Sequence, residues 1–360
     1  MTKLPKLPKG AVKPRPAVMK MAPYSPPTGG RAGKLRLDFN ENTVGCSPHV
    51  IAALKQKLDP ASLTIYPEYS EAKQDIAAYF GVRPEQFVFT NGTDEAIQVL
   101  VNAYVDDGQE VLLLKPAYAM YRFYSEVAGA TIREIEFPQP DLEFPLQDVL
   151  DAITPDTRAI ILANPNNPTG TSVSLLGIER ILHRAKKAVV MVDEAYYEFS
   201  GITALGEIER VPNLFVCRTF SKVFGMAAMR LGCLFSHEAN IAWLHKAQSP
   251  YSVNQLAVMA AQAAVQDPAY IQRYVAESLA ARELLCLGLE RMGISYVPSS
   301  ANFVLGRFGK RAKEVCTALS GQGILVRDRS YEAAGCVRIT AGTREQTRRL
   351  LAALEEIWTQ

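Results

Sequence analysis

The residues best suited to chemistry lie in one stretch, Thr219–Arg230, which follows an apolar segment predicted to be a buried strand, Asn213–Arg218. Lys222 stands there among small, hydroxyl-bearing and apolar neighbours, an unusual setting for a solvated charge. Burial disfavours the ammonium form of a lysine, and a neutral amine can condense with an aldehyde. Ser221 adds a hydroxyl and Arg230 a fixed cation. An amine with phosphate donors beside it is what pyridoxal phosphate requires, although an ordinary lysine at a strand end is the alternative.

A second motif suits an anion. The predicted strand Gln86–Thr90 leads through a turn into a helix predicted over Ala96–Tyr104. Gly92 and Thr93 at the helix start offer free backbone N–H groups and the positive end of a helix dipole, which together favour a phosphate. Asp94 is unfavourable beside a dianion, so its contribution there must be indirect, unless it only caps the helix.

Aromatic and amide groups follow the next two predicted strands. Tyr118 comes after the strand Glu110–Lys115 and faces the crevice where open α/β sheets bind ligands, so its ring could stack on a flat cofactor. Tyr121, on the helix that follows, is assigned to packing. The strand Arg158–Ala163 runs into Asn164–Gly170, whose two Asn-Pro pairs and glycine specify a tight loop. An asparagine held rigidly in that loop could donate a hydrogen bond to a phenolic oxygen.

A carboxylate ends the predicted buried strand Ala188–Val192. Asp193 is costly in that position unless it is paired with a cation. A pyridinium nitrogen would be such a partner, and a salt bridge with an arginine is the alternative. Tyr196, three residues on, can reach the same site.

The composition is that of a soluble globular protein. The chain has 360 residues, and its 39 Lys and Arg against 37 Asp and Glu leave a net charge of +2, too little to attract nucleic acid or a membrane. No apolar run approaches a membrane span, and the N-terminus lacks the apolar core of a secretory signal. The six scattered cysteines favour reduced thiols in the cytoplasm, and the four histidines show no ligand spacing, so no metal is expected.

Alternating strands and helices from residue 85 predict an α/β fold, with a mostly parallel central sheet between helices and a smaller α+β domain. Residues 1–34, with seven prolines among the first 27, are predicted to be an extended arm. The large domain is predicted over 35–265. The small domain is predicted over 266–360, with part of the N-terminal segment, and a long helix, Pro268–Met292, is expected at the join.

Two arginines interrupt apolar strands of the predicted small domain. Arg327 ends the predicted strand Ile324–Arg327, and Arg338 lies within Val337–Thr340. An arginine in such a strand either reaches solvent or binds an anion in a cleft.

Taken together, four motifs resemble those of the fold-type-I pyridoxal-phosphate aminotransferases. In chain order they are Gly92-Thr93-Asp94, the Asn164–Gly170 loop, Asp193-Glu194-Ala195-Tyr196, and Ser221-Lys222 with Arg230. The resemblance extends from about Tyr24 to the end of the chain. Within that group the chain most resembles the histidinol-phosphate aminotransferase family. The segments that carry this finer resemblance are Pro23-Tyr24, Asn40-Glu41, Tyr66-Pro67-Glu68, Pro116-Ala117-Tyr118, Asn302-Phe303, Gly323–Asp328 and Arg338–Arg344.

The resemblance implies a role for each matching residue. Lys222 would form the Schiff base and move the proton at the substrate carbon, Asp193 would pair with the pyridine nitrogen, and Tyr118 would stack on the ring. Asn167 and Tyr196 would bind the phenolic oxygen. The cofactor phosphate would be surrounded by Gly92, Thr93, Asp94, Ser221 and Arg230, with Tyr66 reaching in from the second subunit of a homodimer. The substrate would be held by Tyr24, Asn40, Arg327 and Arg338.

The implied reaction joins imidazole acetol phosphate and L-glutamate to give L-histidinol phosphate and 2-oxoglutarate, in histidine biosynthesis. An aromatic amino-acid aminotransferase is an alternative, because those substrates also carry a ring one carbon from the reacting centre. Threonine-phosphate decarboxylase, a lyase, shares the motifs. A non-catalytic regulator is disfavoured, since no helix-turn-helix pattern precedes residue 35. Thr43–Cys46 stands where the family commonly has a proline, and this departure leaves the identity of the substrate open.

Overall fold

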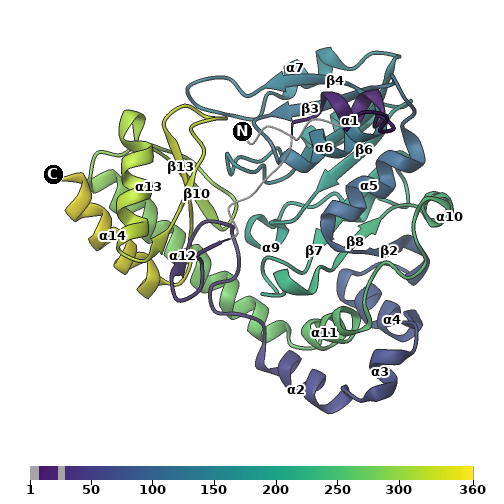
Figure 1. Ribbon diagram of the computed structural model, residues 1–360, viewed down its shortest axis with the longest axis horizontal. Helices are drawn as coiled ribbons and strands as arrows, with labels where there is room; N and C mark the ends of the chain where they lie inside the picture. The colour runs from purple at the N-terminus through teal and green to yellow at the C-terminus, as the bar shows by residue number, and fades with distance from the viewer. Residues whose placement is uncertain (1–7, 23–28, 360) are drawn as a thin grey trace.

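The computed structural model describes residues 8–22 and 29–359, so the predicted substrate residue Tyr24 lies outside the described residues. The described chain forms a seven-stranded sheet, a four-stranded sheet and a two-stranded ribbon (Figure 1). The predicted α/β fold class, with a mostly parallel central sheet flanked by helices, is confirmed.

The large sheet is parallel except for one strand. Its order is β2 (Phe87–Thr90), β8 (Gly232–Phe235), β7 (Leu214–Thr219), β6 (Val189–Asp193), β5 (Thr157–Ala163), β3 (Glu110–Lys115) and β4 (Thr131–Glu136). Only β8 runs antiparallel to its neighbours. Apolar residues dominate the central strands because both faces of the sheet are covered.

Helices cover the two faces of this sheet, and alternate strand residues pack against each layer. In β3, Val111 and Leu113 belong to one apolar cluster, whereas Leu112 and Leu114 belong to the other. The first layer contains α5 (Gly92–Tyr104), α6 (Ala119–Ala128) and α10 (Glu238–Ala247). The second contains α2 (Pro48–Lys57), α4 (Ser70–Phe80), α7 (Leu146–Ala152), α8 (Leu175–Arg184) and α11 (Gln255–Val265), with the short α3 (Pro60–Thr64) and α9 (Tyr197–Ser200) nearby.

The four-stranded sheet is antiparallel and has its own apolar core. Its order is β12 (Arg327–Asp328), β13 (Cys336–Thr340), β10 (Phe303–Arg307) and β9 (Tyr296–Val297). The helices of this part are α12 (Pro268–Arg291), α13 (Ala312–Gly321) and α14 (Arg344–Trp358), and their apolar faces meet the sheet (Figure 1). α12 contacts α14 and β10 here and α9 beside the large sheet, as expected of a helix at a join.

The N-terminal part of the chain differs from the prediction in two places. Residues Pro16–Lys20 form a short helix, α1, inside the predicted extended arm, and it packs against α6. β1 (Leu35–Arg36) pairs in parallel with β11 (Ile324–Leu325), whereas β12 pairs with β13. The single strand predicted over Ile324–Arg327 is therefore wrong, because its two halves hydrogen-bond to different partners. The domain limits at residues 34 and 265 stay predictions.

Three composition-based expectations concern features of the described residues. Within residues 8–22 and 29–359, no helix has the length and apolar character needed to cross a membrane. The same residues contain no group of three or more His, Cys, Asp or Glu side chains arranged to hold a metal ion. All six cysteines are free thiols.

Candidate active site

A cavity of about 490 Å³ lies at the carboxyl edge of the large sheet. Its walls include Ala163, Asp193 and Thr219, the last residues of β5, β6 and β7. Because these strands are parallel, their ends meet at one edge, where open α/β sheets bind ligands. The predicted site residues that line the cavity are Asn40, Thr93, Asp94, Tyr118, Asn167, Asp193, Tyr196, Ser221, Lys222, Arg230, Arg327 and Arg338.

The remaining predicted site residues lie elsewhere. Gly92 is buried beneath Arg230 and does not line the cavity. Tyr66 is 75% exposed and stacks on Tyr251 with ring centroids 4.5 Å apart, so within one chain it does not contribute to the cavity. Its predicted reach into a neighbouring subunit stays a prediction.

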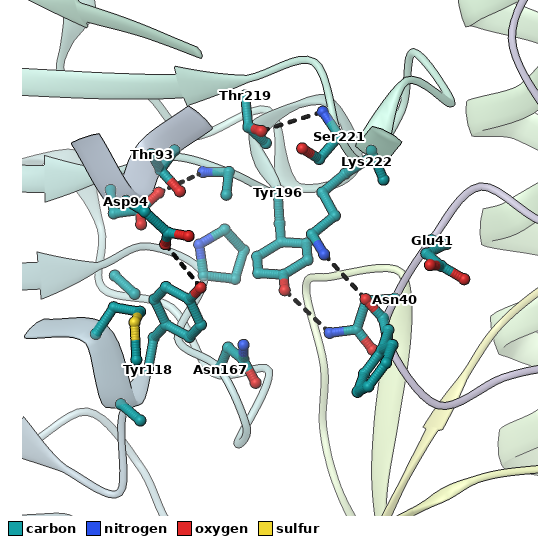
Figure 2. A pocket seen from close by; sticks show the side chains of 18 of the residues that line it. Asn40, Glu41, Thr93, Asp94, Tyr118, Asn167, Tyr196, Thr219, Ser221 and Lys222 are labelled. Atoms are coloured by element: carbon teal, nitrogen blue, oxygen red, sulfur yellow. Dashed lines mark hydrogen bonds between the residues drawn. The ribbon is translucent and has the colours of Figure 1, made fainter. Parts of the chain in front are cut away.

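Lys222 projects into the cavity from the loop after β7 (Figure 2). Its Nζ donates to the carbonyl oxygen of Phe39 at 2.9 Å, and its side chain is half-buried. The Ser221 N–H donates to Thr219 Oγ1 at 3.1 Å, which tightens the turn that presents the lysine. The amine is thus held at the boundary between the large sheet and the segment that follows β1.

Asp193 is a buried carboxylate that receives hydrogen bonds from neutral groups. The Tyr121 hydroxyl donates to its Oδ2 at 2.8 Å, and the Ala195 N–H donates to its Oδ1 at 3.0 Å. Burial raises the pKa of Asp193, although the hydrogen bonds from Tyr121, Cys217 and Ala195 act in the opposite direction. No lysine or arginine of the described ranges forms an ion pair with Asp193, so the site offers it to a cationic group of a ligand.

The arginine salt bridge considered for Asp193 belongs to its neighbour, Glu194. Arg218 Nη2 lies 2.7 Å from Glu194 Oε2, and both side chains are fully buried. Thr203 Oγ1 and the Ala204 N–H also donate to this carboxylate. The two acids of the motif therefore differ in role. Glu194 holds neighbouring segments together through its buried contacts, whereas Asp193 faces the cavity.

The N-terminus of α5 and Arg230 place hydrogen-bond donors at one end of the cavity. Gly92 has a φ of +74°, and a Cβ there would lie 2.5 Å from Arg230 Nη2, so only glycine lets the guanidinium approach. Arg230 Nη1 lies 3.5 Å from Ser221 Oγ. The first N–H groups of α5 have no partner within the helix, which makes them donors for a phosphate beside Thr93.

Asp94 links two functional groups at this end. The Tyr118 hydroxyl donates to its Oδ1 at 2.8 Å (Figure 2). Arg230 Nη2 donates to its Oδ2 at 3.3 Å. The expectation that Asp94 acts indirectly agrees with these contacts, since its carboxylate orients the ring of Tyr118 and the guanidinium of Arg230.

Asn40 connects the cavity to the four-stranded sheet. Its Nδ2 donates to the Tyr196 hydroxyl at 3.0 Å, and its Oδ1 accepts from Thr340 Oγ1 of β13 at 3.1 Å. Asn40 is fully buried with a φ of +56°, a conformation that asparagine tolerates better than most residues. The residue therefore fixes the Tyr196 hydroxyl relative to β13.

Arg338 reaches the cavity from β13 and is almost fully buried. Its Nη1 donates to Asn167 Oδ1 at 2.5 Å, and its Nη2 donates to the Asp38 carbonyl oxygen at 2.6 Å. Burial, with the nearby charges of Arg329 and Arg327, lowers the pKa of Arg338 to about 10. Since Asn167 commits its oxygen to Arg338, the group it can offer a ligand is its NH₂ donor.

Three titratable residues that line the cavity were absent from the sequence-based site. Tyr121 packs in the apolar core as predicted, and its hydroxyl also donates to Asp193; its position one helical turn after Tyr118 was the available signal. Arg329 lines the cavity two residues after Arg327, at the period that keeps strand residues on one face. Glu41 also lines it; burial acts to raise the pKa of Glu41, but the hydrogen bond and charge of Arg31 hold that pKa below its usual value.

The comparisons with known proteins agree with this arrangement. The model of the family "Aminotransferase class I and II" matches residues 32–354. The chain belongs to this family. A histidinol-phosphate aminotransferase of Geobacillus sp. (strain WCH70) is 37% identical over 335 residues, which cover 90% of each chain. The predicted resemblance to aminotransferases is thereby confirmed.

Solved structures show the same fold. A putative histidinol-phosphate aminotransferase from Erwinia carotovora atroseptica is 26% identical, with a TM-score of 0.84, and the match covers 91% of this chain and 96% of that one. The histidinol-phosphate aminotransferase of Sinorhizobium meliloti, solved in complex with pyridoxal-5'-phosphate, has a TM-score of 0.86 over 98% of this chain and 99% of that chain. At 24% identity the second likeness concerns the fold alone.

Proposed function

We propose that this protein is a pyridoxal-phosphate-dependent aminotransferase that converts imidazole acetol phosphate and L-glutamate into L-histidinol phosphate and 2-oxoglutarate. The observation that carries the proposal is the meeting of Lys222 and Asp193 in one cavity, at the ends of the adjacent parallel strands β7 and β6. The substrate assignment rests on the relative from Geobacillus, which bears the name histidinol-phosphate aminotransferase and matches over most of both chains.

The residues of the cavity fit pyridoxal phosphate. Asp193 is a buried carboxylate without a cationic partner in the described part of the chain, and a protonated ring nitrogen would complete it. Ser221, Arg230 and the first turn of α5 supply donors for the phosphate. Tyr118, fixed by Asp94, supplies an aromatic face. When bound, the cofactor supplies an aldehyde that amines condense with and a ring that withdraws electrons from the substrate Cα.

The chain's own groups hold the substrate and move the proton. Lys222 Nζ is the base that takes the proton from Cα of the amino substrate. Asp193 stays anionic beside the ring nitrogen because Tyr121 and Ala195 donate to it. Arg338 grips the substrate anion, and its forked guanidinium suits the carboxylate of glutamate and the phosphate of histidinol phosphate alike.

The proposal includes a cytoplasmic homodimer. Tyr66 does not line its own cavity; it is exposed, stacks on the exposed Tyr251, and follows the exposed Leu63 and Ile65 in the chain. Exposed aromatic and apolar side chains that lie together suit protein contacts. In the dimer, Tyr66 would reach the cofactor phosphate of the neighbouring subunit.

A single half-reaction tests the proposal. Purified holoenzyme is mixed with L-histidinol phosphate in the absence of a keto acid, and the loss of Schiff-base absorbance is followed. Rapid conversion with histidinol phosphate, and slower conversion with phenylalanine or threonine phosphate, is expected. A faster response to phenylalanine would make the enzyme an aromatic aminotransferase, and release of CO₂ from threonine phosphate would make it a decarboxylase. No absorbance change with any amine would rule out an aminotransferase.

A further inference from the structure

Strand pairing gathers three arginines on one wall of the cavity. Arg327 of β12 and Arg338 of β13 are register partners on neighbouring antiparallel strands, so their side chains emerge on the same face. Arg329 lies two residues beyond Arg327, and its N–H donates to the Cys336 carbonyl oxygen at 2.9 Å, which extends the ladder. The two-residue period of a strand places Arg329 on the same face, and all three arginines line the cavity.

This cluster carries more positive charge than the surrounding protein neutralises. Within the described ranges, neither Arg327 nor Arg338 forms an ion pair, whereas Arg329 is paired with Glu332. All three guanidinium groups act on that one carboxylate: burial raises the pKa of Glu332, and the charges of Arg329, Arg338 and Arg327 oppose the rise. The other acid near this wall, Glu41, is paired with Arg31 and Arg36. Glu332 therefore offsets one of the three cations, and two positive charges remain. Like charges on opposed strand positions are destabilising, so an anion is needed between them.

Burial makes the excess positive charge energetically unfavourable, because buried guanidinium groups lose their hydration. Arg329 is 7% exposed and Arg338 is 5% exposed. In both residues Nε is buried and has no hydrogen-bond partner among the residues that the structure describes. Buried cations are stabilised by anions that also satisfy their N–H groups. The cluster therefore has both the charge and the unused donors to receive a doubly charged ligand.

We propose that Arg329 is a specificity-determining residue, which raises the charge of the cluster so that the site selects substrates with two negative charges over those with one. The inference rests on the proposed function. A phosphate monoester carries close to two negative charges at pH 7, and glutamate carries two carboxylates. Phenylalanine offers a single carboxylate. Glu332 limits the net charge of the cluster to about two, because it offsets one of the three positive charges.

The first test measures binding without turnover. Holoenzyme, in which the cofactor fills its own phosphate site, is titrated with inorganic phosphate in a calorimeter, at an ionic strength kept constant with sodium chloride. The change R329Q should weaken phosphate binding about tenfold, since one charge-assisted hydrogen-bonding group is lost. R329K should recover part of the loss. Equal phosphate binding by wild type and R329Q would overturn the proposal. If wild-type enzyme shows no phosphate binding at this constant ionic strength, the cluster attracts an adventitious ion only, and the proposal fails.

The change E332Q separates specificity from a structural role. If Arg329 acts through its charge on the ligand, E332Q removes the offsetting acid and should tighten phosphate binding several-fold. If the Arg329–Glu332 pair only holds the turn between β12 and β13, both changes break the same contact and must weaken binding together. The two roles thus predict opposite signs for E332Q, and this holds even if R329Q does not fold.

The second test uses the half-reaction. In R329Q, the ratio of kcat/KM for histidinol phosphate to that for phenylalanine should fall about tenfold, through KM and not kcat. Glutamate should follow histidinol phosphate, because it also carries two charges; a loss for histidinol phosphate alone would restrict the selection to phosphate and overturn the two-charge argument. If wild-type enzyme does not react with histidinol phosphate, the proposed function fails, whereas the phosphate titration still decides the role of Arg329.

Discussion

Tyr121 sets the charge of the carboxylate that faces the proposed cofactor. Its hydroxyl is fully buried and donates to Asp193, whose pKa burial raises. In Y121F, one of the hydrogen bonds that oppose this rise is gone, so the pKa of Asp193 should rise further. Because protonated Asp193 no longer attracts a pyridinium, cofactor affinity should begin to fall at a higher pH than in wild type. The dissociation constant of pyridoxal phosphate, measured against pH, checks this expectation.

Tyr124 offers a matched control on the same helix, α6, since it is half-buried and does not line the cavity. Y124F should leave the pH dependence of cofactor affinity unchanged. Coincident pH profiles for wild type and Y121F would show that the hydrogen bond to Asp193 only contributes to packing.

Lys222 should be indispensable for turnover but not for cofactor binding. K222A removes the amine that forms the Schiff base and moves the Cα proton, so kcat should fall by at least about 10³-fold. Some pyridoxal phosphate should stay bound, because Asp193 and the phosphate donors remain. Turnover and the cofactor retained after gel filtration measure the two effects.

Lys115 provides the comparison for Lys222, because it also ends a strand of the large sheet but is exposed and paired with Glu136. K115A should keep nearly full activity. Full activity in K222A would remove the basis of the whole functional assignment.

Residues that end parallel strands could be identified from the sequence, whereas those held by distant contacts could not. Asp193 ends its strand, and Tyr118 and Lys222 each lie three residues after theirs, so the edge rule for parallel sheets brings them together. Tyr121 could not be separated from a packing residue, since its partner lies 72 positions along the chain. The roles of the site residues themselves stay predictions.

At the scale of elements, the loop after β7 is fixed by direct contact with the loop before α2. Gly225 has a φ of +71°, and a Cβ there would lie 2.3 Å from the Gly45 carbonyl oxygen. G225A should therefore push the two loops apart, displace Lys222 and destabilise the fold by about 2–4 kcal/mol, the sum of backbone strain and overpacking. Thermal unfolding and cofactor content check the two effects.

Gly201 is the matched control for Gly225, because it has the same φ of +71° and nothing within 4 Å of its Cβ position. G201A should cost only the strain of the left-handed backbone, about 1 kcal/mol. If both variants lose the same stability, the contact between the loops makes no separate contribution.

Local pattern predicted β2, β3, β5, β6 and β7 of the large sheet within one residue at each end, because burial on both faces and flanking turns define them in the sequence. The break at Val326 could not be predicted. It arises because β11 pairs with β1, almost 300 residues away, while β12 pairs with β13. The helix α1 was also missed, since a five-residue helix in a proline-rich stretch has no measurable period.

At the scale of the whole molecule, the proposed dimer makes a prediction that one subunit cannot satisfy alone. If Tyr66 serves the neighbouring site, a mixed dimer of Y66A and K222A subunits contains one site with both residues intact. Two affinity tags allow this dimer to be purified after co-expression. It should show about half of wild-type activity per dimer, although each parent homodimer is nearly inactive.

A second mixed dimer shows whether Tyr66 acts in the neighbouring subunit or in its own. When one subunit is wild type and the other carries both Y66A and K222A, a crossing Tyr66 leaves no complete site, because the only intact lysine faces the mutated tyrosine. If Tyr66 acts within its own subunit, this second dimer is the active one and the first is not. The two pairings contain the same substitutions in the same amounts, so a difference in stability cannot imitate the result. An active second dimer would therefore remove Tyr66 from the neighbouring site, and the exposed stack of Tyr66 on Tyr251 would need another explanation.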